Sequence, residues 1–136
     1  MFEEILRESG YSEKAIEYYQ NKVNVGKMYN PTITHFYTGP CGDKIKISLK
    51  IQNEVIIDAK FQAIGCAGAF SSASALTEMV KGIKIEEAEQ ITDRDILFHL
   101  EDMPASKSDC ITLVRTAFKE SVEKYKNEVR ITKQEK

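Results

Sequence analysis

The residues of this chain best suited to chemistry are its three cysteines, Cys41, Cys66 and Cys110. An odd number argues against a framework of disulfides alone, and it fits a reducing compartment where thiols stay available for metals or sulfur chemistry. The intervals between them are far longer than the paired Cys-x-x-Cys pattern of a closed structural zinc site. We therefore expect an open site in which thiolates bind a soft metal or handle sulfur.

The sequence around these cysteines favours thiolates. Cys66 and Cys110 fall in the predicted first turns of helices, where free amide groups and the helix dipole lower the pKa of a thiol. Glycines flank Cys41 and Cys66, so backbone can approach a bulky inorganic ligand and leave amides free to hydrogen-bond its sulfides. For Gly42 and Gly65, a simple role in turns explains the residue equally well.

Three thiolates leave one coordination position for a weaker ligand. The candidates are Asp43, two residues after Cys41, and Asp109, the immediate neighbour of Cys110. A carboxylate is a hard ligand and a poor match for a soft metal site, so a site closed in this way should be labile. Each aspartate could equally serve as a helix cap or a turn residue. His35 and His99 are expected to be packed or surface residues rather than ligands.

The periodicity predicts three consecutive strands. Residues 32–38 are β-branched and aromatic, and residues 44–52 and 55–64 alternate between apolar and polar side chains around a hairpin turn at Asn53-Glu54. The last strand is expected to bury Ile57, Ala59, Phe61 and Ala63. Three such strands in sequence form an antiparallel meander.

Helical patterns make up most of the rest. Ser12 can cap a helix to about Gln20, apolar residues recur at helical spacing up to Val80, and Gly82 sits at an expected C-terminal cap. Shorter helices are predicted over 86–90 and 93–100, and a long one over about 107–126. The fold class is α+β, a small three-stranded antiparallel sheet with helices packed on one face. We expect a flexible leader (1–11), one domain (12–127) and a polar tail (128–136).

Composition excludes several classes of partner. The chain has 136 residues, and its 19 basic and 21 acidic side chains nearly balance, which argues against binding to nucleic acid. No stretch approaches the roughly 20 apolar residues of a membrane span, so we expect no membrane association. Together with the free thiols, this predicts a cytoplasmic protein.

Several motifs, taken in order, resemble the NifU/IscU-type iron-sulfur cluster assembly scaffolds over residues 11–126. They are Asn24-Val-Gly26, Pro40-Cys41-Gly42-Asp43, Asp58-Ala-Lys-Phe61 leading to Gly65-Cys66, the small-residue run 67–74, Val80-Lys-Gly82 with Glu87-Ala88, and a Pro-x-x-Lys segment before Cys110. The resemblance implies a sheet-and-helix domain with the cysteines gathered at one exposed end.

The resemblance also implies a function without catalytic turnover. Cys41, Cys66, Cys110 and Asp43 would hold iron and a transient [2Fe-2S] cluster, with Asp109 as the alternative fourth ligand. A cysteine desulfurase would supply persulfide sulfur, with Cys110 as the favoured first acceptor, and apo-proteins would receive the cluster. The aspartate matching Asp43 is associated with release, and zinc can occupy the site when iron is absent. Assembly into a homo-oligomer is left open.

Two departures from the family pattern matter. Asp109 stands where many members carry a histidine, and Met103-Pro-Ala-Ser-Lys107 replaces the Leu-Pro-Pro-Val-Lys stretch that engages an Hsp70-type chaperone, which puts a chaperone interaction in doubt. The alternative function is a zinc-organised persulfide relay, although the interval before Cys110 looks too short for the insertion typical of that branch. A thiol enzyme using Cys110 or Cys66 has little support, because no histidine is placed by sequence as a base.

Overall fold

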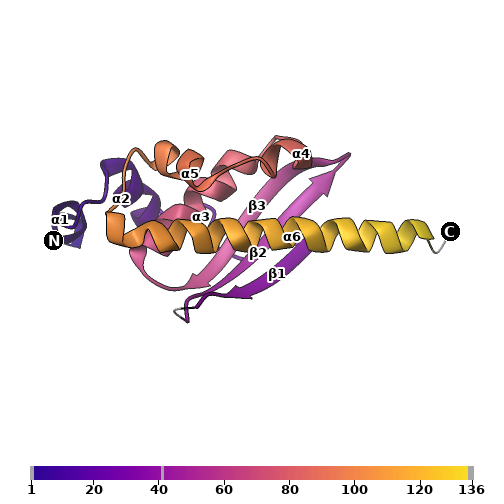
Figure 1. Cartoon of the computed structure of the whole chain (residues 1–136), viewed down its shortest axis with the longest axis horizontal. Helices are drawn as coiled ribbons and strands as arrows, with labels where there is room; N and C mark the ends of the chain where they lie inside the picture. Colours follow the sequence, from indigo (N-terminus) through magenta and orange to yellow (C-terminus); the bar gives the residue numbers. More distant parts are fainter. Residues whose placement is uncertain (1, 41, 135–136) are drawn as a thin grey trace.

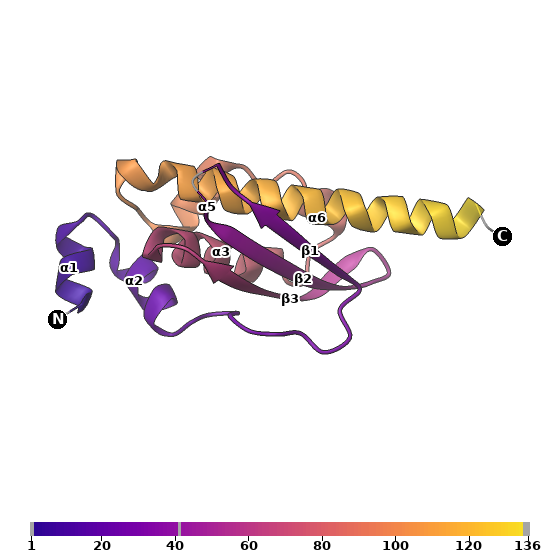
Figure 2. The same cartoon turned by 90° about the horizontal axis from the view of Figure 1, so that it is seen from below.

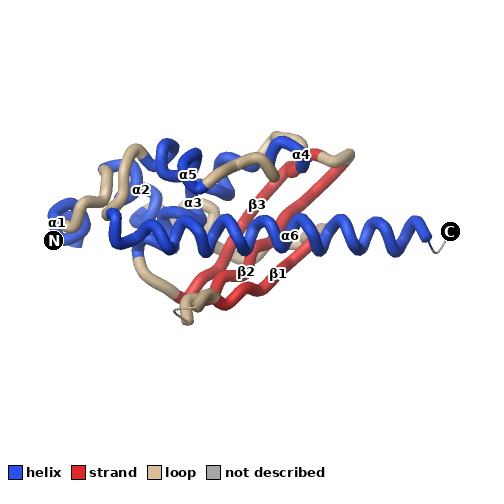
Figure 3. The backbone as a smooth tube through the Cα atoms, in the orientation of Figure 1, coloured by secondary structure: helices blue, strands red, loops and turns tan. Residues whose placement is uncertain are grey.

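The structure, a computed structural model, describes residues 2–40 and 42–134. Strands β1 (Ile33–Thr38), β2 (Lys44–Gln52) and β3 (Val55–Ile64) form one antiparallel sheet in the order β1-β2-β3. Helix α3 (Ala67–Val80) contacts β3, and helix α6 (Ser108–Gln134) contacts β1 and β2. Figures 1 and 2 show α6 crossing the sheet, and Figure 3 shows it as a blue helix over the red strands. The predicted α+β class is confirmed.

The hairpin between β2 and β3 has the backbone that its residues favour. Asn53 and Glu54 both adopt positive φ, 54° and 63°, which suits the right-handed twist of the two strands. The inward residues of β2 are almost completely buried, namely Ile45, Ile47, Leu49 and Ile51. The alternation read from the sequence therefore gives the correct buried face for this strand.

The start of β3 differs from the expectation. The register shifts between Lys50 and Ile51, so that Ile51 pairs with Ile56. Ile56 is fully buried, whereas Ile57 is 43% exposed. The expected burial of Ile57 was wrong, because an irregularity of this kind changes the face on which the flanking side chains lie. Ala59 and Phe61 are buried as expected, and Ala63 is partly buried.

Helix α3 is the centre of the molecule. It packs against α2, α5, α6 and β3, and small residues make up most of its surface. Two of its buried hydroxyl groups bond to carbonyl groups, since Ser71 donates to Ala15 O at 2.8 Å and Ser74 donates to Val23 O at 2.9 Å. Small side chains let neighbouring elements approach closely, and the paired hydroxyls avoid the cost of burying unsatisfied polar atoms.

Helix α6 is longer than the periodicity predicted. It runs from Ser108 to Gln134, and its far end extends beyond the sheet (Figures 1 and 2). Its buried stripe contains Ile111, Val114, Phe118 and Val122, as expected. Apolar spacing predicts only the part of a helix that packs on a core, so a polar extension is missed. Within the described ranges, none of the helices combines the length and the apolar content needed to cross a bilayer.

The N-terminal segment lies on this framework. Helix α1 (Phe2–Glu8) covers part of the predicted leader, and Leu6 and Tyr11 are buried. Ser12 is the N-cap of helix α2 (Glu13–Gln20), and its side chain accepts a hydrogen bond from Ala15 N as predicted. Ser12 N also donates to Asp102 O at 3.3 Å, so the start of α2 is joined to the segment that precedes α6.

Shorter elements complete the chain between α3 and α6. They are α4 (Ile85–Ala88), α5 (Asp93–Leu100) and the 3₁₀ turn η1 (Ala105–Lys107). Helix α5 opens with a reciprocal capping box between Thr92 and Asp95. Gly82, just after α3, has φ +84°, a backbone that favours glycine, as expected for the end of this helix.

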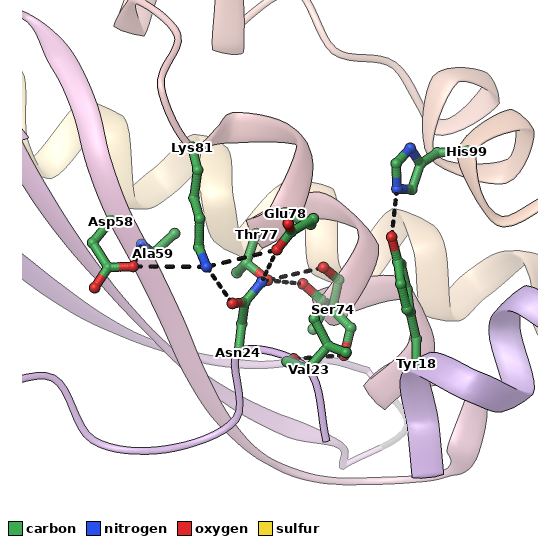
Figure 4. A network of polar contacts seen from close by, with 11 residues as sticks. Tyr18, Val23, Asn24, Asp58, Ala59, Ser74, Thr77, Glu78, Lys81 and His99 are labelled. Carbon is green, nitrogen blue, oxygen red and sulfur yellow. Dashed lines mark hydrogen bonds and ion pairs between the residues drawn. The ribbon is translucent and has the colours of Figure 1, made fainter. Parts of the chain in front are cut away.

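A polar network holds the segment before β1 against the sheet and α3 (Figure 4). Asn24 has φ +63° and donates from Nδ2 to Thr77 Oγ1 at 2.9 Å. Its side-chain oxygen accepts from Lys81 Nζ at 2.5 Å, and the same ammonium lies 3.8 Å from Asp58 Oδ1. Phe61 N then donates to Asn24 O at 3.0 Å, so this segment borders the free edge of β3.

The central position of α3 leads to the first prediction. Leu76→Ala should lower the free energy of unfolding by about 2–5 kcal/mol, because Leu76 is fully buried and its loss leaves a cavity. Urea unfolding followed by circular dichroism measures the change. Leu97→Ala is the matched control on α5, where the side chain is 37% exposed, and it should cost less than about 1 kcal/mol. Equal losses in both variants would contradict the central role of α3.

Candidate metal centre

Two of the predicted sulfur ligands meet at the N-terminal ends of the two main helices. Cys66 is the N-cap residue of α3, and Cys110 lies in the first turn of α6. Their Sγ atoms are 3.4 Å apart, and both residues are partly buried. Two thiolates on one tetrahedral ion lie roughly 3.8 Å apart, given metal–sulfur bonds of about 2.3 Å. The pair is therefore spaced for a shared metal.

Asp43 adds an oxygen to this pair. Its carboxylate lies at the start of β2, and one ligand atom from each of Asp43, Cys66 and Cys110 falls within 4.8 Å of the other two. Gly65 makes room for it, since a Cβ there would stand 3.1 Å from Asp43 Oδ2. A side chain at position 65 would therefore crowd the carboxylate, which would have to move by a few tenths of an ångström.

The two other predicted ligands, Cys41 and Asp109, are not part of this group. Cys41 lies outside the described residues. Asp109 is exposed and does not belong to the Asp43–Cys66–Cys110 group, although it lines the same cavity of about 320 Å³ as Asp43 and Cys110. Among the described residues, Asp43 is thus the better placed of the two aspartates.

Neither histidine is part of this group. His35 Nε2 pairs with Glu120 Oε1 at 2.9 Å, across β1 and α6. His99 Nε2 lies 2.9 Å from the Tyr18 hydroxyl, beside a larger hollow of about 830 Å³ against α5 whose lining includes neither Cys66 nor Cys110. This hollow is larger, but it is not the candidate metal centre, because Cys66 and Cys110 lie elsewhere.

The two thiols share a proton unequally. A hydrogen bond from Cys110 lowers the pKa of Cys66 to about 5, helped by the amide groups of Ala69 and Gly68 and by the Lys107 charge. The same contact with Cys66, together with burial, raises the pKa of Cys110 well above its usual range. At neutral pH the metal-free pair is therefore one thiolate that accepts a hydrogen bond from one thiol.

One neighbour of the cysteines was missed by sequence reasoning. Tyr11 is only 7% exposed, and its hydroxyl lies 3.2 Å from the position that a Cβ on Gly68 would occupy. Cys110 Sγ lies at the same distance from that position, and Lys107 Cβ lies at 3.3 Å. A tyrosine remote in sequence, in a segment without a strong pattern, carries no local signal that it lies beside the same glycine as a cysteine.

The fold thus defines a small sheet-and-helix domain in which two thiols and a carboxylate converge near the helix N-termini, a candidate metal centre. Comparisons with known proteins agree with this class. Residues 10–132 match the family described as NifU-like N terminal domain. The chain therefore belongs to the family of NifU-like N-terminal domains.

Two individual relatives are similar to this chain over most of its length. The chain is 39% identical over 122 residues to the iron-sulfur cluster assembly scaffold protein IscU of Escherichia coli K12, covering 86% of this chain and 94% of that protein. It is 38% identical over 129 residues to the nitrogen fixation protein NifU of Azotobacter chroococcum, covering 93% of this chain but only 42% of NifU. The chain thus spans less than half the length of that relative.

A solved structure shows the same fold. The crystal structure of a nitrogen-fixing NifU-like protein (N-terminal) from Brucella abortus aligns with a TM-score of 0.72, covering 90% of this chain and 98% of that chain. The two sequences are 15% identical, so this likeness concerns the fold alone.

The shared proton yields the second prediction. In metal-free protein with Cys41 replaced by serine, the rate of Cys66 alkylation by iodoacetamide should rise with pH around about 5 and be nearly flat at pH 7, because the thiolate forms as pH passes the lowered pKa. Peptide mass spectrometry separates Cys66 from Cys110. Adding Cys110→Ala removes the hydrogen-bond donor and should move the midpoint upward. A Cys66 midpoint near 9 before that change would contradict the shared proton.

Proposed function

We propose that this protein is a scaffold on which a [2Fe-2S] cluster is assembled and from which it is transferred. Cys66, Cys110 and Asp43 supply ligands, and Cys41 supplies the third thiolate. The single observation that supports this most is the convergence of two thiol sulfurs and one carboxylate at the N-termini of α3 and α6. The name of the Escherichia coli relative, an assembly scaffold, points to the same function.

The chemistry of the ligands suits an iron-sulfur cargo. Thiolates bind iron-sulfur clusters, and backbone amides near the sulfurs stabilise their negative charge. Here the Gly68 and Ala69 amides and the Lys107 ammonium all favour the thiolate form of Cys66. The site is also partly exposed, as transfer to another protein requires.

We further propose Asp43 as the fourth ligand. Its carboxylate lies within the group formed with the two cysteines, whereas the exposed Asp109 does not. A hard carboxylate on a soft site exchanges readily, which favours delivery over permanent storage. Asp109 lines the same cavity as Asp43 and Cys110 without belonging to that group.

Sulfur would arrive as a persulfide from a cysteine desulfurase. A scaffold thiolate attacks the outer sulfur of the donor's persulfide, the donor's S–S bond breaks, and the donor cysteine leaves as a thiolate. Family resemblance assigns the first acceptor to Cys110. In the metal-free pair, however, Cys66 is the thiolate, so Cys110 becomes a nucleophile once its proton has left.

Other partners follow from the same proposal. Iron-sulfur apo-proteins would accept the cluster, and homo-oligomers stay a prediction, as does a cytoplasmic location. A chaperone interaction stays in doubt, since residues 103–107 depart from the family motif. Met103 is also only 5% exposed and accepts a hydrogen bond from Ser72, so this part of the segment is packed into the domain.

Reconstitution tests the proposed function. Anaerobic incubation of the full chain with ferrous iron, cysteine, dithiothreitol and a cysteine desulfurase should produce visible sulfur-to-iron charge-transfer absorption. Cys66→Ala should abolish this absorption because it removes a ligand, whereas His99→Ala should retain it because that imidazole lies outside the ligand group. A flat visible spectrum for the unmodified chain would overturn the proposal.

A zinc-organised persulfide relay is the alternative, and the 3.4 Å sulfur separation also suits a single zinc ion. In the same experiment, zinc would stay bound in equimolar amount during sulfur transfer while no cluster formed. Metal analysis after reconstitution, together with the visible spectrum, separates the two functions.

The fourth ligand gives a further prediction. Asp43→Ala should slow cluster loss to a chelator by at least about fivefold, the effect of about 1 kcal/mol in activation free energy, because a readily exchanging carboxylate is removed. Decay of the visible absorption measures the rate. Asp109→Ala is the matched control and should lose its cluster at the original rate. If Asp43→Ala matches the unmodified chain, the role moves to Asp109.

A further inference from the structure

A leucine of α6 packs against the loop that leads to Asp43. A Cβ on Gly39 would stand only 2.3 Å from Leu113 Cδ1 and 3.3 Å from Leu113 Cγ, and Gly39 itself is buried. Leu113 is 8% exposed, so its side chain fills the space that a side chain at position 39 would need. This contact joins the loop between β1 and β2 to α6.

The backbone at Gly39 does not itself require glycine. Gly42, in the same loop, has φ +90°, a conformation that favours glycine, whereas Gly39 does not have a positive φ. The obstacle to a methyl group at position 39 is therefore Leu113, since the next nearest atom, Asp43 O, is an ordinary 3.8 Å away. Glycine is needed here because of a side chain on another element.

Hydrogen bonds within the loop connect Gly39 to Asp43. Gly39 N donates to Asp43 O at 2.8 Å, and Gly42 N donates to Gly39 O at 3.0 Å. The loop begins directly after the paired residues Thr38 and Lys44 of the sheet, so its two ends are held together. A displacement of Gly39 would therefore be passed on to the backbone of Asp43.

The same leucine is fixed relative to one of the sulfurs. Leu113 lies three residues after Cys110 on α6, a spacing that places two side chains next to each other on one helix face. Both residues line the cavity of about 320 Å³, together with Asp43. Leu113 thus connects the helix that carries Cys110 with the loop that leads to Asp43.

We infer that Leu113, seated against Gly39, is a positioning residue that sets the place of the Asp43 carboxylate relative to Cys110. This inference rests on the proposed function, because it takes Asp43 and Cys110 as ligands. Leu113 acts on the ligands through packing and has no ligand atom of its own. Replacing a residue that supports a metal ligand typically changes metal affinity by about 10–100-fold.

Cobalt measures how well the ligands are placed. Anaerobic titration of the metal-free chain with Co²⁺ should produce thiolate-to-cobalt charge-transfer absorption, and competition with a chelator gives the affinity. Gly39→Ala should lower this affinity by about tenfold or more, because its methyl group and Leu113 cannot occupy the same space. Leu113→Ala should lower it too, because the loop loses its contact with α6.

The double variant separates this contact from other effects at position 39. In Leu113→Ala protein the space for a methyl group is open, so adding Gly39→Ala should change the Co²⁺ affinity by less than about twofold. An equal loss in both backgrounds would mean that alanine at position 39 acts by another route, and it would overturn the inference.

A further pair of variants tests whether Asp43 carries the effect. In Asp43→Ala protein, Gly39→Ala should cause no additional loss of Co²⁺ affinity, since there is no carboxylate left to displace. An additional loss in that background would assign the effect to another part of the loop and overturn the inference.

His35→Ala is the matched control for packing between β1 and α6. It removes the contact with Glu120, which joins the same two elements outside the Asp43–Cys66–Cys110 group. The Co²⁺ affinity should be unchanged in this variant. A loss as large as that of Gly39→Ala would make the effect one of general packing and overturn the inference.

The remaining outcomes are also decisive. If the unmodified chain shows the absorption and Gly39→Ala matches its affinity, the inference fails while the proposed function stands. If the unmodified chain shows no thiolate-to-cobalt absorption, the proposed function fails and takes the inference with it. Should Gly39→Ala not fold, the metal-free unmodified chain still tests the contact, because Leu113 methyl protons should show nuclear Overhauser effects to the Gly39 Hα protons. Their absence would overturn the inference.

Discussion

The close packing of α3 is the constraint on which the rest of this structure depends. This helix is surrounded by β3, α2, α5 and α6, and its small residues allow all of them to approach. Because α6 packs directly against it, the N-terminal ends of the two helices come together. Cys66 and Cys110 stand at those ends, so the sulfur separation of 3.4 Å is set by helix packing rather than by loop geometry.

Two glycines, which have no side chain, provide space at the candidate site. Gly65 leaves space for the Asp43 carboxylate, and Gly68 leaves space for the Tyr11 hydroxyl, Cys110 Sγ and the Lys107 stem. A methyl group at either position would push these groups apart. The small-residue run that starts α3 therefore serves two purposes, because it permits tight packing along the helix and provides space at its first turn.

Much of the fold could be predicted because its signals are local. The bounds of β2 and β3, the hairpin at Asn53-Glu54, the capping by Ser12 and the buried stripe of α6 all follow from alternation, turn residues or helical spacing. The exposure of Ile57 could not be predicted, since a register shift depends on the partner strand. The full length of α6 was missed as well, because a helix that leaves the core has no apolar period.

The site was only partly visible in the sequence. The cysteines and Asp43 stand in recognisable motifs, but only the fold shows that Asp43 lies closer to the sulfurs than Asp109 does. Tyr11 had no signal at all, since its position near Gly68 and the cysteines comes from the docking of residues 10–12 on the segment before α6.

The unequal pair of thiols has a thermodynamic consequence. At neutral pH the two sulfurs hold one proton between them, and ligation requires both as thiolates. If these sulfurs hold the proposed cargo, each loading event would therefore expel a proton into solvent, and the affinity for the cargo would increase with pH. In that scheme a local fall in pH would favour unloading by mass action, because protons would compete with the metal for the two sulfurs.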